Sequence, residues 1–459
     1  MNIKRLASQG LEPKFTTRFK NIFFVSSASQ DRLASGVVSI ITPLKKSFGA
    51  KWINTSTITE NLDGEKSKFQ FQKNNEGFQH FCNRGLWPLC HEISVNPIFE
   101  NCNFDAYVEI NKIFAETILI ENKGQESPLI FIHDYHLALL PEILRKHIPK
   151  AIIIYFWHIP WPSLKQLKKC PWQSQIVSSL AYSNNIGFQT KTDVNRFNQA
   201  LENHSIKNCD PIFRPFHVGD YPATVEWPSE IINTSESYDE ISNLHQLNTK
   251  VILCLGVDRF DYIKGIIERL NSIEKLFITN PNLRGKLVFL QICISTRRDI
   301  KEFCSYEKVV KEKITAINNK FSYDDWSPLI LITNELDKKE LTKYYKAADF
   351  LMISSLKDGM NLVAKEFIAS RDDEMGILLL SKFTGSSKKL KEAIIFNPKD
   401  EISTVNAINA AIAMPALEIK NRMLSLRKYV RKNDIYLWVK KQLEDADEKI
   451  NANESQKPD

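Results

Sequence analysis

A chain of 459 residues is too long for one compact core, and the usual size of domains predicts two or three of them. Its 43% hydrophobic and 25% charged residues are typical of a soluble globular protein, and no apolar run approaches the roughly 20 residues that a membrane helix needs. The net charge of +7 is spread along the chain without dense Lys and Arg blocks, so neither a nucleic acid nor a membrane is expected as a partner.

The N-terminus, the cysteines and the histidines bear on location and cofactors. The first 20 residues are basic and have no apolar signal core, which favours a solvated arm over an organelle targeting segment. The eight cysteines form no C-x-x-C pair, and Cys254 and Cys293 fall inside strand-like segments, so a reducing cytoplasm is expected. His133 and His136 lie three residues apart without further ligands at zinc spacing, so no metal or other cofactor is expected.

Short apolar segments rich in β-branched residues recur along the chain, with longer amphipathic segments between them. Strands are predicted at residues 21–26, 128–133, 151–156, 185–188, 250–256, 286–292, 329–333, 349–354 and 376–380. Their hydrophobicity is continuous rather than alternating, which indicates strands buried on both faces in parallel sheets covered by helices. The predicted fold is α/β, with two Rossmann-like, doubly wound parallel-sheet domains.

The boundary between the domains is expected near residues 226–250, which are acidic, rich in Ser and Asn, and poor in apolar periodicity. This gives an N-terminal domain at residues 1–225, a C-terminal domain at 226–435, and a C-terminal helix with a frayed tail at 436–459. Ligands of such sheets bind beyond the carboxyl ends of the strands, so the site is expected there, in the cleft that the two domains face.

The segment "SLKDGMNLVAKE" joins one of these strands to a helix. Asp358, beside Gly359, stands where it can accept hydrogen bonds from sugar hydroxyls, and Glu366 suits a vicinal diol such as ribose. An anion site is predicted at the helix N-terminus, where backbone N–H groups are available near Met360, Asn361 and Leu362. The alternative makes Asp358 a turn former and Glu366 a solvated helix residue.

The segment "VDRFDYIKG" follows another predicted strand and places Arg259 and Lys264 five residues apart. Two fixed cations at a strand end suit a diphosphate leaving group, because negative charge builds on its oxygen as the bond breaks. Asp258 and Asp261 can instead neutralise these cations as surface ion pairs, an alternative of similar weight for this motif alone.

Three further strand ends carry polar residues. "FIHDYHL" delivers Asp134 and His136, and "YFWHIPWP" ends a strand at His158. A single His after an apolar strand is more often a packed residue than a catalyst, but two strands with polar residues at one edge favour function. "STRRD" adds Arg297 and Arg298, which suit a second anion such as a sugar phosphate.

Taken together, the motifs "HDYHL", "HIPWP", "GFQT", "VDRFDYIKG", "DGMNLVAKE" and "LSKFTGSSKKL" resemble the trehalose-6-phosphate synthase family, over about residues 78 to 440. The resemblance implies retaining glycosyltransferases of GT-B architecture. The implied reaction moves glucose from a nucleotide-diphosphate glucose, with UDP-glucose favoured over ADP or GDP donors, to glucose 6-phosphate and gives trehalose 6-phosphate. Such enzymes need no metal, because fixed cations take its role.

The resemblance also implies roles for single residues. On the donor side, Arg259 and Lys264 match the diphosphate clamp, Asp358 and Asn361 the groups around the sugar and its phosphates, Glu366 the ribose ligand, and Gly36 a loop glycine over the donor. His158 matches the histidine that touches the transferred glucose. On the acceptor side, Asp134 matches an aspartate beside the sugar, Arg297 a phosphate ligand, and Trp52 and Trp87 tryptophans that line the pocket.

The sequence departs from the family on the acceptor side. Ala28 stands where the family has an arginine that contacts the acceptor phosphate, Ser35 replaces a loop glycine, and Phe78 replaces a tyrosine. Arg32 or Arg298 can substitute for the missing cation. Another phosphorylated acceptor, as in glucosylglycerol-phosphate synthases or pseudo-glycosyltransferases, and a non-catalytic relative that binds sugar phosphates are the alternatives, and a homo-oligomer is possible.

Overall fold

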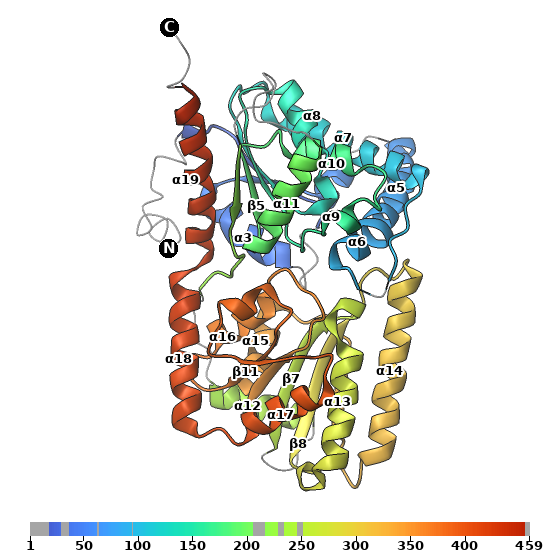
Figure 1. Ribbon diagram of the computed structural model, residues 1–459, viewed down its shortest axis with the longest axis vertical. Helices are drawn as coiled ribbons and strands as arrows, with labels where there is room; N and C mark the ends of the chain where they lie inside the picture. The colour runs from blue at the N-terminus through green and yellow to red at the C-terminus, as the bar shows by residue number, and fades with distance from the viewer. Residues whose placement is uncertain are drawn as a thin grey trace. The chain divides into compact units, whose positions relative to one another are not determined.

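The computed structural model describes residues 18–28, 36–61, 64–93, 95–204, 216–227, 234–245 and 251–454. The chain divides into two compact units, each with a six-stranded sheet (Figure 1). The first unit is Met1–Glu226 with Ile435–Asp459, and the second is Trp227–Asp434. All strand pairs within these two sheets are parallel, as the continuous apolar strands predict.

The sheet of the first unit has the strand order β2-β1-β3-β4-β5-β6. Its strands are β1 (Ile22–Ser26), β2 (Lys51–Ile53), β3 (Leu129–His133), β4 (Ile152–Phe156), β5 (Asn185–Phe188) and β6 (His217–Asp220). The register places Phe24 beside Phe131 and Phe131 beside Ile154. Every residue of β1, β3, β4 and β5 is buried, because helices cover both faces of the central strands.

The helical elements of the first unit follow the strands in the chain. They are α3 (Gly36–Phe48), α4 (Thr55–Asn61), α5 (Gly64–His80), η1 (Phe81–Leu86), α6 (Trp87–His91), α7 (Asn101–Asn122), η2 (Tyr135–Leu137), α8 (Leu140–His147), α9 (Leu164–Leu167), α10 (Gln173–Leu180) and α11 (Lys191–Asn203). The C-terminal helix α19 (Ile435–Glu454) contacts α3, β4, β5 and β6, and in Figure 1 it runs beside this sheet. The buried indole of Trp438 donates to the carbonyl of Tyr221 at 3.0 Å, so the apolar face of α19 joins it to the first unit.

The sheet of the second unit has the order β12-β11-β10-β7-β8-β9. Its strands are β7 (Ile252–Arg259), β8 (Leu287–Ile294), β9 (Leu329–Ile332), β10 (Phe350–Ile353), β11 (Ile377–Ser381) and β12 (Ile394–Phe396). Each strand predicted from the sequence is confirmed. The three strands that were not predicted, β2, β6 and β12, are short edge strands that are partly exposed, so they carry no continuous apolar run.

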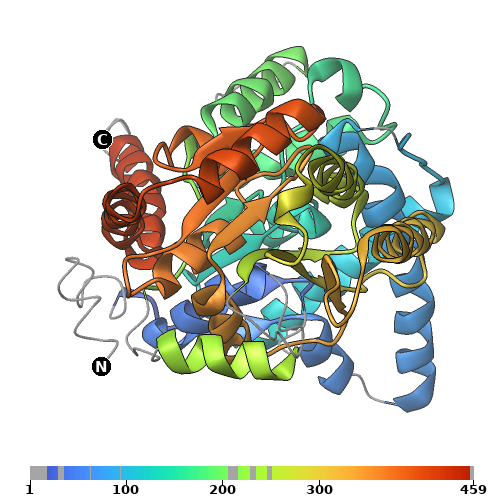
Figure 2. The same ribbon diagram turned by 90° about the horizontal axis from the view of Figure 1, so that it is seen from below.

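Helices cover both faces of the second sheet. They are α12 (Thr234–Leu244), η3 (Tyr262–Lys264), α13 (Ile266–Thr279), η4 (Pro281–Leu283), α14 (Lys301–Phe321), α15 (Lys338–Ala347), α16 (Leu362–Ser370), η5 (Gly385–Lys388), α17 (Glu401–Ile412) and α18 (Ala416–Lys432). One core joins α13, α14 and α17 to the strands, and Figure 2 shows α12 on the opposite side of the sheet from α17. Residues 226–250, where the domain boundary is expected, contain helix α12, which packs against α15.

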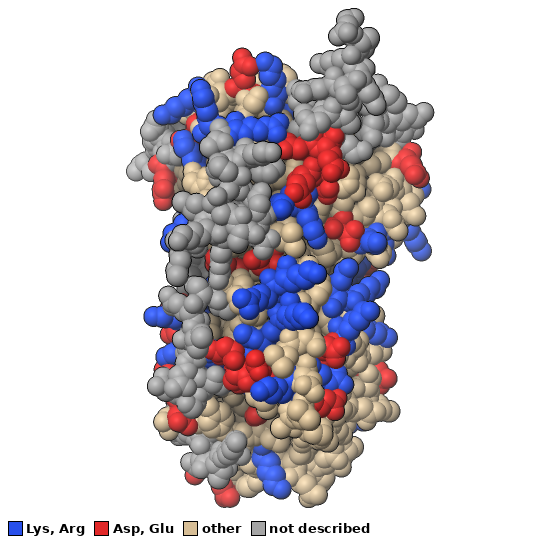
Figure 3. All heavy atoms as spheres, turned by 90° about the vertical axis from the view of Figure 1, so that its left-hand side faces the viewer, with Lys and Arg blue, Asp and Glu red and all other residues tan. Residues whose placement is uncertain are grey.

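Among the described residues, no single helix is long and apolar enough to cross a membrane, although α17 and α18 pass such a test as one pair bent by 108°. Cys254 and Cys293 are buried free thiols in β7 and β8, as predicted. Figure 3 shows Lys and Arg side chains interspersed with Asp and Glu side chains on the face that it draws.

Candidate functional site

The carboxyl ends of three neighbouring strands gather predicted residues of both the donor side and the acceptor side. β10, β7 and β8 are adjacent in the second sheet. Lys264 follows β7, Arg297 follows β8, and Asp358 and Asn361 follow β10. Parallel strands end at one edge of a sheet, so the topology alone brings these side chains to the same place.

Lys264 and Asp358 form the central ion pair of this edge. The Nζ atom of Lys264 lies 2.7 Å from Oδ2 of Asp358, and each side chain is only 14% exposed. The same oxygen accepts from the Ser355 hydroxyl and from Nδ2 of Asn361, both at 3.1 Å. Three donors fix this carboxylate, and the ion pair ties the loop after β7 to the loop after β10.

Asn361 also begins helix α16. Its backbone has φ +67°, which Asn tolerates better than most residues, and its side-chain oxygen accepts from the N–H of Ala364 at 3.1 Å. The first-turn N–H groups of Leu362 and Val363 precede the hydrogen-bond ladder of the helix and lie at the positive end of its dipole. Beside Lys264, this turn suits an anion such as a phosphate.

Arg259 and Arg297 share a second carboxylate, that of Asp261. Oδ2 of this fully buried side chain accepts from Arg297 at 2.9 Å and from Arg259 at 3.5 Å. The Arg297 guanidinium also lies 4.7 Å from the Phe303 ring centre. Arg298 is exposed. Arg32, the other candidate for a substitute cation, lies outside the described residues.

Sequence reasoning missed Arg269, which is buried among polar partners below this edge. It donates to Ser354 at 2.9 Å, to Asp258 at 2.8 Å and to Gln291. Burial raises the pKa of Asp258, and the neighbouring Arg269 charge opposes that rise. Ser354 in turn bonds the carbonyl of Lys264 at 3.0 Å, so this buried network supports the loop that carries the lysine. The sequence does carry a signal for this buried arginine, because Arg269 interrupts the apolar face of α13.

Glu366 lies on α16 and accepts from the hydroxyl of Tyr345 at 3.0 Å. Burial raises the pKa of Glu366, and the hydrogen bond from Tyr345 acts in the opposite direction. Tyr345 belongs to α15, and no sequence motif pointed to it.

In the first unit, Asp134, His136 and His158 come together where β3 and β4 end. Asp134 has φ +73°, and its carbonyl accepts from the Tyr155 hydroxyl at 2.6 Å. Its carboxylate accepts from the backbone N–H of His158 at 3.2 Å and lies 3.8 Å from Nδ1 of His136. The strained backbone of Asp134 is therefore held by contacts from β4 and from the segment that follows it.

His158 is paired with a second histidine. Its Nε2 atom lies 3.0 Å from Nδ1 of His133, the last residue of β3. Burial lowers the pKa of His133 to about 3, and burial together with His133 and His136 lowers the pKa of His158 well below its usual value. Both rings are neutral at physiological pH, so His158 can offer a hydrogen bond but no fixed charge.

The predicted acceptor residues of the first unit are largely buried. Phe78 stacks on Tyr107 with ring centres 5.8 Å apart, and its ring centre lies 6.1 Å from that of His136. The ring centre of Trp87 lies 6.0 Å from that of Tyr135. The indole of Trp52 donates to the Ser26 hydroxyl at 3.0 Å, which donates to the carbonyl of Ala28 at 3.3 Å. Contacts thus link Trp52 to the segment of Ala28, and Phe78 to His136. Gly36 is the exposed first residue of α3, and Ser35 lies outside the described residues.

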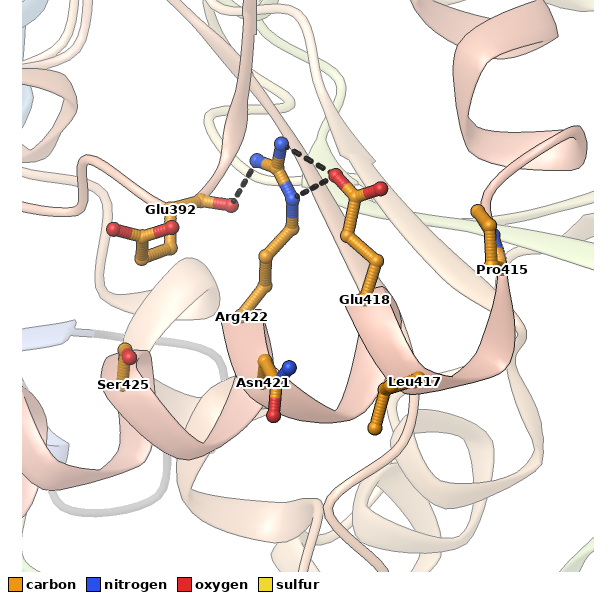
Figure 4. Close-up of a pocket in the computed structure, with 7 residues that line it drawn as sticks. All are labelled: Glu392, Pro415, Leu417, Glu418, Asn421, Arg422 and Ser425. Carbon is orange, nitrogen blue, oxygen red and sulfur yellow. Dashed lines mark hydrogen bonds and ion pairs between the residues drawn. The ribbon is translucent and has the colours of Figure 1, made fainter.

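A hollow of about 480 Å³ lies elsewhere on the second unit, along α18 (Figure 4). Its lining residues are Glu392, Pro415, Leu417, Glu418, Asn421, Arg422 and Ser425. Arg422 bonds Glu418 at 2.8 Å and the carbonyl of Glu392 at 3.1 Å. None of the predicted site residues lines it. Within the described part of the chain, no three His, Cys, Asp or Glu side chains are placed to hold a metal ion.

Two doubly wound parallel sheets are the architecture of the GT-B class of glycosyltransferases, and cations and a helix N-terminus lie at the carboxyl edge of the second sheet. Residues 16–448 match the family described as "Glycosyltransferase family 20", and the chain belongs to that family.

Relatives and solved structures agree with this assignment. The chain is 32% identical over 379 residues to an "Alpha,alpha-trehalose-phosphate synthase [UDP-forming] A" from Dictyostelium discoideum, which covers 79% of this chain but only half of that longer relative. A UDP-forming synthase structure from Burkholderia xenovorans in complex with glucose 6-phosphate has a TM-score of 0.82 at 25% identity, covering 93% of this chain and 100% of that one. An E. coli structure bound with UDP-2-fluoro glucose has a TM-score of 0.80 at 27% identity and covers 93% and 99%.

Proposed function

We propose that this protein transfers glucose from UDP-glucose to glucose 6-phosphate, with retention of configuration, and so forms trehalose 6-phosphate. The observation that carries the proposal is Lys264, held 2.7 Å from Asp358 beside the first turn of α16. Related proteins support the choice of substrates, because their names and ligands include a UDP-forming synthase, glucose 6-phosphate and UDP-2-fluoro glucose.

The second unit supplies the donor chemistry. Lys264 and Arg259 stabilise the negative charge that grows on the diphosphate as the glycosidic bond to it breaks. The amides at the start of α16 bind the phosphate oxygens. Asp358 accepts from a sugar hydroxyl, and the carboxylate of Glu366 binds the ribose diol.

The remaining roles concern the acceptor and the transferred sugar. Arg297 binds the acceptor phosphate, and Asp134 orients the acceptor sugar beside Phe78 and Trp87. His158 is neutral and offers a hydrogen bond to the transferred glucose. The departing phosphate, held by the cations, helps to take the proton of the attacking hydroxyl, so retention needs no carboxylate nucleophile.

A second candidate uses the same donor with a different phosphorylated acceptor. It is favoured by Ala28, which has no charged group for the acceptor phosphate, and by Phe78, which is buried and has no hydroxyl. A charge-assisted hydrogen bond is worth about 1.5–3 kcal/mol, so its loss changes which acceptor binds best. We place the reaction in the cytoplasm, an assignment that the free thiols of Cys254 and Cys293 support.

The test is to incubate the purified protein with UDP-glucose and a panel of acceptor phosphates, and to follow UDP release and the product by NMR. Glucose 6-phosphate is expected to give an α,α-linked product, and Arg259→Ala is expected to remove turnover without unfolding the protein. Robust turnover of glycerol 3-phosphate with none of glucose 6-phosphate would establish the second candidate. Absence of UDP binding would exclude both candidate functions.

A further inference from the structure

The buried carboxylate of Asp261 contacts two arginines that the proposed function assigns to different substrates. Its Oδ2 atom accepts from Arg297 at 2.9 Å and from Arg259 at 3.5 Å. Its Oδ1 atom accepts from the backbone N–H of Ile263 at 3.2 Å and so begins the turn η3. One oxygen therefore serves the local turn, and the other serves both guanidinium groups.

The backbone of Arg297 carries strain that points to the same contact. Its φ is +60°, which is uncommon for a residue other than glycine. Asp261 holds the guanidinium on one side, and the Phe303 ring lies 4.7 Å from it. Residues held in such conformations cluster at functional sites, because the surrounding contacts must fix them. Here those contacts set the position of an arginine that stands at the carboxyl edge of the sheet.

We propose that Asp261 is a positioning residue for both substrates, which holds Arg259 for the donor diphosphate and Arg297 for the acceptor phosphate. This inference rests on the proposed function. A guanidinium carries five N–H donors in a rigid plane, which allows one arginine to bond a carboxylate and a phosphate at the same time. Asp261 thus fixes the direction in which each guanidinium points its remaining N–H donors.

Asp261→Asn separates this role from a purely structural one. The amide keeps an oxygen for the N–H of Ile263, so the turn is retained. It replaces Oδ2 by an NH₂ group, which is a donor and faces the donors of Arg259 and Arg297. Both arginines lose the acceptor that Asp261 supplies, and neither is itself removed.

The experiment measures binding of UDP and of glucose 6-phosphate separately by calorimetry. We expect Asp261→Asn to weaken glucose 6-phosphate binding about 10- to 100-fold, which is the usual range for a lost charge-assisted bond. UDP binding should weaken less, because Arg259 lies farther from Asp261 and is 27% exposed, against 13% for Arg297. The control is Asp373→Asn, which removes another carboxylate from an arginine, Arg371 at 2.8 Å, and should leave both affinities unchanged.

A double variant tests the mechanism. In the Arg297→Ala background, Asp261→Asn should have no further effect on the affinity for glucose 6-phosphate and should still weaken the binding of UDP. If the parent protein binds neither ligand, the proposed function fails. If the parent binds both and Asp261→Asn leaves either affinity unchanged, the shared positioning role is overturned.

A second variant keeps the test decisive if Asp261→Asn folds poorly. Asp261→Glu retains both carboxylate oxygens on a side chain that is one methylene longer. We expect it to bind both ligands more tightly than Asp261→Asn does, because an acceptor still faces the arginines. Equal affinities of the two variants would contradict a role for the carboxylate.

Discussion

Gly265 is the position where a single added methyl group tests the architecture of the candidate site. It follows Lys264, has φ +63° and precedes helix α13. A Cβ atom there would lie 2.2 Å from the backbone carbonyl oxygen of Ser354, and no real Cβ contact is that short. Because the obstacle is backbone, Gly265→Ala must move the loop after β7 away from the end of β10.

The cost of this movement can be worked out from the contacts it breaks. The positive φ alone costs Ala about 1–2 kcal/mol. The loop is tied by hydrogen bonds from Ser354 to the Gly265 carbonyl at 2.9 Å and from the N–H of Leu356 to the Ile263 carbonyl at 2.7 Å. Each such bond is worth about 1 kcal/mol, so Gly265→Ala should destabilise the second unit by about 3–4 kcal/mol in all.

Gly285→Ala is the matched control in the same unit. Its φ is +78°, and its Cβ would also lie 2.2 Å from an atom, the hydroxyl of Tyr323. That side chain is 49% exposed and can rotate away, so only the backbone cost of about 1–2 kcal/mol should remain.

The assay is hydrogen exchange followed by mass spectrometry, because peptides from β7, β8 and β10 report on the second unit alone. Calorimetry with UDP adds a second readout, since Gly265→Ala displaces Lys264 and Gly285→Ala does not. We expect a difference in opening free energy of about 2 kcal/mol between the variants, and weaker UDP binding only for Gly265→Ala. Equal losses of stability would show that the Ser354 carbonyl does not obstruct a side chain at Gly265.

Three further changes have expected outcomes. Lys264→Met should lower kcat about 10²- to 10³-fold, which is the usual cost of losing one transition-state donor. Lys275→Met, on the exposed side of α13, should leave kcat unchanged. Steady-state kinetics with UDP-glucose check both variants. The pH profile of kcat should show no inflection near pH 6.5 from His158, because burial lowers the pKa of this histidine. An inflection near pH 6.5 that His158→Asn abolishes would contradict this expectation. Burial lowers the pKa of Lys365 to about 7, so the folded protein binds fewer protons than the unfolded chain between pH 7 and 10, and stability rises with pH. Urea unfolding should therefore show the stability of Lys365→Met, relative to the parent, declining over that range.

The fold was predictable because burial of both strand faces leaves a direct mark on the sequence. β7 and β8 read as continuous apolar runs, and the structure confirms them as central parallel strands. β12 has the pattern of a short, partly exposed edge strand, so nothing distinguishes it from a loop. α12 lies in a polar segment, and its packing against α15 is a tertiary contact that local periodicity does not encode.

The site was predictable where its residues follow strands in a parallel sheet. The prediction brought Lys264 and Asp358 to one edge, and the structure places them in contact. The shared role of Asp261 was not predictable, because an aspartate near an arginine in sequence is equally compatible with a surface ion pair. Arg297 reaches it across 36 residues, through the adjacency of β7 and β8. Sequence indicates which residues reach the edge, and packing decides which of them share a partner.

The ion pair of Lys264 with Asp358 raises the question of how a cation already bound to a carboxylate can serve a phosphate. Removing one member of a largely buried pair is costly because the other charge loses its partner. Asp358 keeps the hydroxyl of Ser355 and the amide of Asn361 on the same oxygen, each at 3.1 Å, when Lys264 turns to an incoming anion. These two neutral donors lower the cost of the exchange, and a sugar hydroxyl can then take the place of the lysine. The pair therefore holds the two loops in position before binding, and Ser355→Ala should weaken UDP affinity even though Ser355 is assigned no contact with the nucleotide.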